Sequence, residues 1–122
     1  MQKVTPQAKL LYGALRKRKI KCVMEAYDGY KHVDISIPSA KIDIEVDGLQ
    51  HYIDPMQILS DFNREHYSDR KDNYNTIHIP NLIIEHHINE VADAIAIAAK
   101  MQIKIIEKSR KDRAVRELLT RN

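Results

Sequence analysis

The chain has 122 residues and a formal net charge of +3, which fits one domain with a buried core. One cysteine excludes a disulfide framework, so a reducing, cytoplasmic compartment is expected. No segment approaches the roughly 20 apolar residues that span a bilayer, and no apolar segment follows the basic start, so neither a membrane partner nor a signal peptide is expected.

The first predicted element is a helix that Thr5 caps and Pro6 begins. Its basic run from Arg16 to Lys21 lies near the end, where cations favour the helix dipole. Residues 20–27 predict a first strand, and Cys22 within it is interpreted as a buried structural thiol. The apolar stripe of the helix is predicted to consist of Leu10, Leu11, Ala14 and Leu15.

Two strands with strict alternation follow, at residues 33–37 and 42–47. A tight loop at Ser39-Ala40 pairs residues whose numbers sum to 79, which places Asp34 opposite Glu45. Directly opposed like charges destabilise a sheet, so a bound divalent cation is the expected compensation. The alternative is an ordinary solvated polar face, although such faces usually mix basic and hydroxyl side chains with acids. The alternation of the two strands places four carboxylates on one face: Asp34, Asp43, Glu45 and Asp47.

The rest of the chain predicts a helix from Pro55 to about Lys71, a strand at residues 75–79 and a long helix from about Asn89. The expected fold class is α/β, a mixed four-stranded sheet flanked by helices in the order α-β-β-β-α-β-α. Residues 1–103 are expected to form the domain, and residues 104–122 a basic helical extension that projects or contacts a partner.

Charge is distributed unevenly along the chain. Residues 1–24 contain seven basic and no acidic residues, and residues 100–122 contain eight basic and three acidic ones. The 75 residues between them contain five basic and fourteen acidic ones. An acidic centre between basic ends fits a cation site beside surfaces that hold a polyanion. Two ordinary solvated helices rich in Lys and Arg would give the same pattern.

Hard oxygen ligands favour Mg²⁺ or Mn²⁺. Asp34 and Glu45 would be direct ligands, together with the backbone carbonyl of Val46. Asp47 would bind a second ion or position water, and His51 would donate a proton or a hydrogen bond to the transition state. A carboxylate-bound Mg²⁺ with open positions for water and a phosphate oxygen is typical of phosphodiester hydrolysis.

Motifs along the chain support the same chemistry. They are Thr5 with Leu15-Arg16, Val33-Asp34-Ile35, Glu45-Val46-Asp47-Gly48-Leu49-Gln50-His51, Asp61-Phe62-Asn63-Arg64, and Ile77-His78-Ile79 with Asn81. Over about residues 5–100 the chain therefore resembles the PD-(D/E)XK, or restriction-endonuclease-like, nucleases. It is most similar to the small group related to the very short patch repair endonucleases. The resemblance implies their mixed sheet with flanking helices and metal-dependent cleavage of DNA.

Two positions depart from the wider family pattern. The first helix of relatives commonly carries a Glu, where this chain has Ala8, and the Lys of E-x-K is Asp47 here, as in the closer group. Glu25 would substitute for the helix Glu only if its strand lies beside Asp34. Asp43 and Gln50 are further candidates for a supporting role.

Nucleic-acid contacts are expected from the basic end of the first helix and from Arg64. Arg64 would reach a phosphate or pair with Asp61 one helical turn away. The leading hypothesis is a Mg²⁺-dependent DNA endonuclease; the alternatives are a catalytically degenerate nucleic-acid-binding or assembly module, and an RNA-directed nuclease. A homodimer through the C-terminal helix is also plausible. The candidate contacts in the first helix and just after it are Arg16, Lys17, Arg18 and Lys19.

Overall fold

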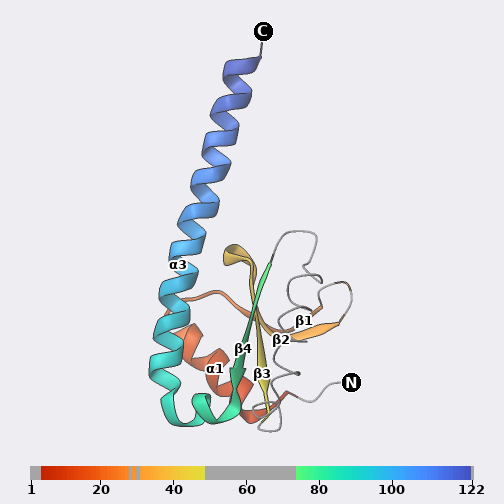
Figure 1. Ribbon diagram of the computed structural model, residues 1–122, viewed down its shortest axis with the longest axis vertical. Coiled ribbons are helices and arrows are strands. Elements are labelled where there is room, and N and C mark those ends of the chain that lie inside the picture. Colours follow the sequence, from red (N-terminus) through yellow and green to blue (C-terminus); the bar gives the residue numbers. More distant parts are fainter. Residues whose placement is uncertain (1–3, 28, 30, 49–73, 122) are drawn as a thin grey trace, which may run out of the picture.

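The computed structural model describes residues 4–27, 29, 31–48 and 74–121 (Figure 1). The order of the described elements is α-β-β-β-β-α rather than the predicted α-β-β-β-α-β-α, and the difference is the helix expected between the third and fourth strands. The helix expected from Pro55 to Lys71 lies outside the described residues. The elements are α1 (Pro6–Lys17), β1 (Val23–Tyr27), β2 (His32–Ile37), the 3-10 helix η1 (Pro38–Ala40), β3 (Ile42–Asp47), β4 (Asn75–Pro80) and α3 (Asn81–Thr120).

The four strands form one mixed sheet in the order β1-β2-β3-β4, which confirms the predicted sheet. β1 and β3 run antiparallel to β2, whereas β4 runs parallel to β3. Ile35 pairs with Ile44, and Ile37 with Ile42, so the predicted register sum of 79 is correct. The connection is the short helix η1 rather than a two-residue loop, and Lys41 closes it in the left-handed conformation at φ 54°.

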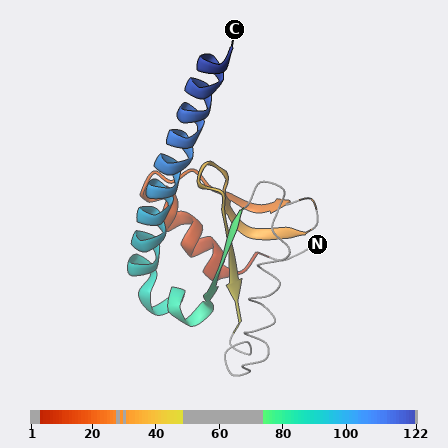
Figure 2. The same cartoon turned by 45° about the horizontal axis from the view of Figure 1, so that its top comes forward.

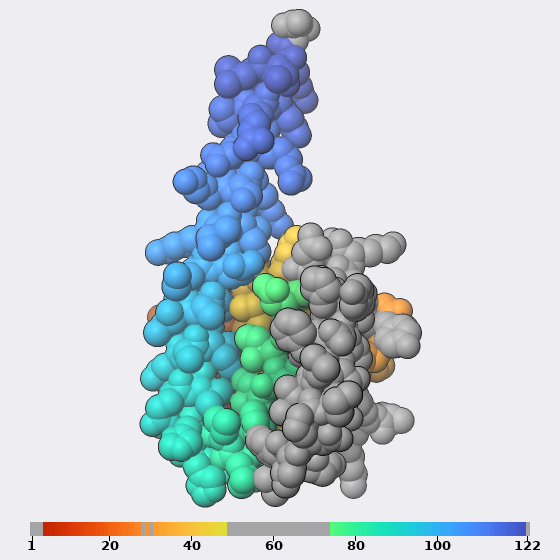
Figure 3. Space-filling view, in the orientation of Figure 1, coloured from red at the N-terminus to blue at the C-terminus, as the bar shows by residue number. Residues whose placement is uncertain are grey.

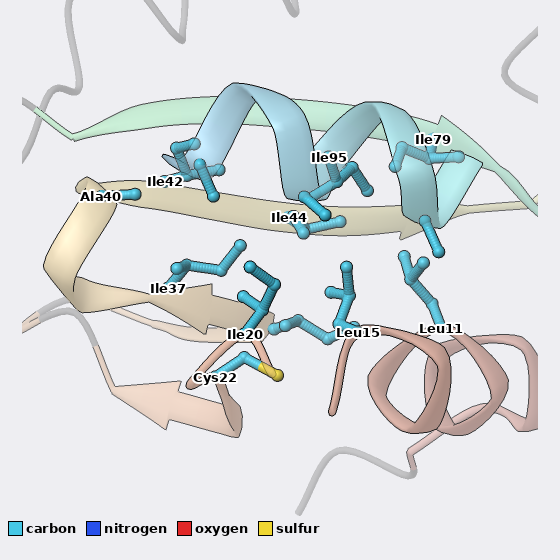
Figure 4. Close-up of a cluster of buried hydrophobic side chains, with 14 of the residues drawn as sticks. Leu11, Leu15, Ile20, Cys22, Ile37, Ala40, Ile42, Ile44, Ile79 and Ile95 are labelled. Atoms are coloured by element: carbon cyan, nitrogen blue, oxygen red, sulfur yellow. The ribbon is translucent and has the colours of Figure 1, made fainter. Parts of the chain in front are cut away.

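One face of the sheet forms the core because alternate side chains of a strand point to the same side. α1 and α3 lie on this side of the sheet (Figures 1 and 2). Figure 4 shows Leu11 and Leu15 of α1, Ile95 of α3 and Ile44 of β3 pointing toward one another. The alternate positions of β2 and β3 point to the opposite face, so the carboxylates lie away from both helices.

α1 begins where the sequence predicts. The hydroxyl of Thr5 accepts a hydrogen bond of 3.2 Å from the backbone N–H of Ala8, and Pro6 occupies the first helical turn. Leu11 and Leu15, four residues apart, are fully buried. Leu10 was predicted to belong to the stripe but is 55% exposed, because it lies about 100° around the helix from Leu11.

α3 begins at Asn81, eight residues before the predicted start at Asn89. The two positions are separated by a break at His87, whose φ of −138° and ψ of 41° are not helical. The prediction therefore found only the segment after the break. From residue 107 to residue 121 every side chain is exposed, and this part of α3 stands clear of the sheet (Figure 3). In the described ranges, no helix is both long and apolar enough to cross a membrane.

Candidate metal and nucleic-acid site

One side chain from each strand lines up across the sheet. The β2–β3 register, continued by one position beyond Ile35 and Ile44, places Asp34 opposite Glu45. The β1–β2 pairs on either side of position 25 place Glu25 opposite Asp34, and the β3–β4 register pairs Glu45 with His78. These four residues are named the polar row: Glu25, Asp34, Glu45 and His78.

The central pair of the polar row is the pair predicted to bind metal. Burial raises the pKa of Glu45; the nearby Lys31 ammonium opposes this rise, whereas the nearby Asp34 carboxylate increases it. The Glu45 side chain is only 14% exposed. The two carboxyl groups are therefore close neighbours on one face, as predicted from the alternation.

Asp34 is held in place by the backbone of the next strand. The N–H of Val46 donates a hydrogen bond of 2.7 Å to Oδ2 of Asp34. The observed contact of Val46 is thus made by its N–H; coordination of a metal by its carbonyl stays a prediction. A carboxylate that is held by a backbone donor keeps its orientation, which favours a fixed site for a cation.

Lys31 supplies a positive charge beside this pair. Its Nζ lies 3.2 Å from Oε1 of Glu45, and its side chain is 47% exposed. Lys31 is not among the residues predicted from the sequence. It precedes β2, and no alternating pattern includes it, so no periodic signal indicated its position.

Asp47 contacts a side chain of the fourth strand, and its predicted role, to bind a second ion or position water, stays a prediction. Its Oδ2 lies 2.9 Å from Nδ1 of His78. His78 was also not predicted to belong to the site. The signal was present, because Thr76 and His78 alternate with Ile77 and Ile79 and so point to the polar face.

The carboxylate face is not an ordinary solvated surface. Asp43 is 2% exposed, and its cross-strand partner Ser36 is 1% exposed. The alternative interpretation of the sequence, a solvated polar face, is therefore wrong at these two positions. Buried acidic side chains need partners of opposite charge, hydrogen-bond donors or a metal ion.

Glu25 has unusual backbone and side-chain surroundings. Its φ of 55° is left-handed, which costs an ordinary residue roughly 1–2 kcal/mol. Its Oε1 is buried and has no hydrogen-bond partner among the described residues. β1 does lie beside β2, as the supporting role of Glu25 requires.

The described residues nevertheless contain no group of three His, Cys, Asp or Glu side chains placed to hold one metal ion. The candidates Gln50 and His51 lie outside the described residues.

The basic candidates of the first helix differ in their surroundings. Arg16, Lys17 and Lys19 are exposed. Arg16 lies over the ring of Tyr12, with its guanidinium carbon 5.7 Å from the ring centroid, and also donates to the Tyr12 hydroxyl. Arg18 instead joins α1 to α3 through Asp93 and Asn89. Arg64 lies outside the described residues.

An open hollow of about 740 Å³ lies at the basic end of α1. Arg16, Lys19 and Lys21 give it a positive rim, and Pro38 places it at the end of β2 remote from Asp34. Cys22 also lines it, and burial raises the pKa of this thiol, an effect that Arg16 partly opposes. The buried thiol confirms the structural interpretation of Cys22. The basic rim and the polar row are thus separate parts of the surface.

Comparisons with protein-family models, with curated proteins and with solved structures gave no match. The function is therefore inferred from the residues themselves, above all from the placement of Asp34 opposite Glu45.

Proposed function

We propose that this protein is a metal-dependent DNA endonuclease with a restriction-endonuclease-like fold, and that Asp34 and Glu45 bind its Mg²⁺ or Mn²⁺. The observation that supports the proposal best is the register that sets these two residues opposite each other on β2 and β3, with the Glu45 side chain only 14% exposed. Two carboxylates in contact repel each other, and burial increases the cost of their charges. A divalent cation between them removes both penalties.

The residues fit a hard cation in number and kind. Mg²⁺ is usually bound through one or two carboxylates while it keeps several waters, so the Asp34–Glu45 pair is sufficient. The raised pKa of Glu45, caused by burial and by Asp34, is the property expected of a site that gains from a cation. When bound there, Mg²⁺ would lower the pKa of a coordinated water and neutralise charge on the phosphate.

The remaining residues of the site would position the nucleic acid. The Lys31 ammonium, 3.2 Å from Glu45, would attract a phosphate oxygen to this edge of the carboxylate pair. Asp47 fixes the ring of His78 through Nδ1. The exposed cations of α1 and of the C-terminal part of α3 would bind the phosphate backbone without reading its sequence.

The test is nicking of supercoiled plasmid in Mg²⁺ or Mn²⁺. Asp34→Asn removes one proposed ligand and should lower the nicking rate at least about 100-fold, the upper end of the loss seen for outer-shell partners of a metal. The matched control is Glu90→Gln, which removes one acidic charge from a side chain that is 75% exposed and should nick normally. Equal rates for wild type and Asp34→Asn would refute the proposal.

Binding of the metal can also be measured without catalysis, through the melting temperature. A metal that binds only the folded protein raises its melting temperature by mass action. Mn²⁺ should therefore raise the melting temperature of the wild type and of Glu90→Gln, but not that of Asp34→Asn. This measurement separates loss of the metal from loss of another catalytic function.

The second candidate function is a non-catalytic nucleic-acid-binding module on the same fold. Ala8, at the helix position where relatives of the resembled family carry a Glu, is fully buried, so α1 contributes no acid there. DNA binding without nicking and without a Mn²⁺-dependent rise in melting temperature would favour this candidate. RNA in place of plasmid, in the same assay, tests the RNA-directed alternative.

A further inference from the structure

A row of exposed apolar side chains runs along α3 on the side away from the sheet. The side chains buried against the sheet include Ile95, Ala99 and, in part, Ile103. At about 100° per residue the exposed row lies roughly 150° around the helix from them. Exposed apolar rows of this length are typical of surfaces that contact another protein. Its members, with their exposed fractions, are Ile97 (61%), Met101 (60%), Ile105 (58%), Val115 (53%) and Leu119 (79%).

The spacing of this row is that of a coiled-coil seam. From Met101 onward the positions on this face recur after four, three, four, three and four residues, which is the heptad repeat of positions a and d. The outer four of these six positions are apolar, and the inner two carry opposite charges. In order they are Met101, Ile105, Lys108, Asp112, Val115 and Leu119.

The two charged positions decide the orientation of a second copy. A parallel pair would place Lys108 against Lys108 and Asp112 against Asp112, and both contacts are repulsive. An antiparallel pair centred on Arg110 places Lys108 of each copy against Asp112 of the other. The same register places Ile105 against Val115 and Met101 against Leu119, so every apolar side chain of the seam meets another.

We propose that two copies of this chain associate through residues 101–119 of α3 as an antiparallel coiled coil, in which the numbers of facing residues sum to 220. The shared segment is about 28 Å long at 1.5 Å per residue. Because the second helix lies on the side of α3 away from the sheet, it leaves the core contacts of Ile103 in place. The association does not depend on the nuclease proposal.

This arrangement sets the two domains at opposite ends of the coil. The last turns of each helix cover Met101 and Ile105 of the other copy, side chains that are more than half exposed in the single chain. A coil of less than three heptads buries a small area, so the dimer is expected to dissociate on dilution. Measurements therefore need a range of concentrations, roughly 5 to 500 μM.

The charge pair provides the first test, by sedimentation equilibrium of the full chain. Lys108→Glu faces Asp112 of the second copy with a like charge and should weaken the dimer at least about tenfold. The double variant Lys108→Glu/Asp112→Lys restores opposite charges in the antiparallel register and should recover the wild-type dissociation constant. Rescue is expected of the antiparallel register; because positions 108 and 112 also lie one turn apart on the same helix, the cross-linking experiment below decides between the two orientations. A monomeric wild type, or a dimer that none of these changes affects, would overturn the proposal.

Disulfide trapping provides the second test. Ile105→Cys and Val115→Cys, each in a Cys22→Ala background and with different tags, are mixed and oxidised with copper phenanthroline. The proposed register brings position 105 of one copy to position 115 of the other, so mixed dimers should form. Two copies of the same variant hold their thiols about 15 Å apart along the axis, too far for a disulfide. Cross-links only between identical variants would overturn the antiparallel register.

Discussion

Glu45 is the residue at which stability and the proposed function oppose each other. Burial, together with the adjacent Asp34, makes its charged form unfavourable, and Lys31 offsets only part of this. Without a cation the folded protein therefore holds the Glu45 proton more tightly than the unfolded chain does. Residues that destabilise a fold in this manner are often found at binding and catalytic sites.

This opposition predicts a pH dependence of stability in metal-free solution. Because the pKa of Glu45 is raised in the folded state, its favourable contribution is fully present below the unfolded pKa and is lost as pH rises through the folded pKa. In a chelator, the free energy of unfolding of the wild type should therefore fall, relative to Glu45→Gln, as pH rises from about 4.5. Urea denaturation of both proteins between pH 4 and pH 7, approximately, measures the difference. Parallel pH profiles would contradict a raised pKa.

The sequence predicted the Asp34–Glu45 pair because local patterns were enough to place it. Asp34 and Glu45 belong to two alternating strands joined by a short connection, so their register follows from nearby residues alone. His78 pairs with Glu45 through a parallel strand 33 positions further along the chain, and no local pattern specifies that register. Lys31 lies before its strand and follows no alternation. Non-local pairing and irregular backbone thus account for both omissions.

At the scale of elements, Arg18 links the two helices that cover the sheet. Its guanidinium donates to Asp93 of α3 at 2.7 Å, to Asn89 at 3.3 Å and to the carbonyl of Ala14 at 2.9 Å. The Ala14 carbonyl belongs to the end of α1, where backbone acceptors lack intrahelical partners. The side chain is only 22% exposed. Its main contribution is therefore to the packing of α1 on α3, whereas its contact with nucleic acid stays a prediction.

The link through Arg18 can be measured against its neighbour. Arg18→Met keeps most of the aliphatic stem but removes three hydrogen bonds, and should lower the free energy of unfolding by roughly 1–2 kcal/mol. Lys17→Met removes the same charge from an exposed side chain and should stay within about 0.5 kcal/mol of the wild type. Urea denaturation at one pH and salt concentration compares the two. If Lys17→Met is as destabilised as Arg18→Met, the effect comes from charge rather than from the link.

The start of α3 illustrates why element boundaries were harder to predict than elements. The run from Leu82 to Ile84 is apolar and follows Pro80, a pattern shared by strand ends and buried helix starts. In the structure this run forms the start of α3, and Ile84 is buried in the core. The break at His87 interrupts the helical pattern, so the sequence does not show that the segments before and after it form one element. Tertiary packing, which local patterns do not contain, therefore sets this boundary.

At the scale of the molecule, positive charge is concentrated at the two ends of the chain, whereas the strands carry five acidic side chains. The last 15 residues contain six basic and two acidic side chains. The described part of this segment is a fully exposed helix that stands clear of the sheet (Figure 3). It is well placed to contact a polyanion, while the carboxylate pair would bind the proposed cation.

A chain that ends at Glu107 tests the contribution of this segment to DNA binding. Its formal net charge falls from +3 to −1, and its unfolding midpoint at low protein concentration should not change because residues 108–121 are exposed. Binding to duplex DNA at low salt should weaken at least about tenfold. The slope of log binding constant against log salt concentration should become shallower by about 0.9 for each lost phosphate contact.

The double variant Ile105→Ser/Leu119→Ser is the control, since it keeps every cation but removes apolar contacts of the coil. If this control loses as much affinity as the truncated chain, pairing of two copies rather than the cations determines the affinity. Unchanged binding by the truncated chain would exclude the C-terminal segment as a DNA-binding surface.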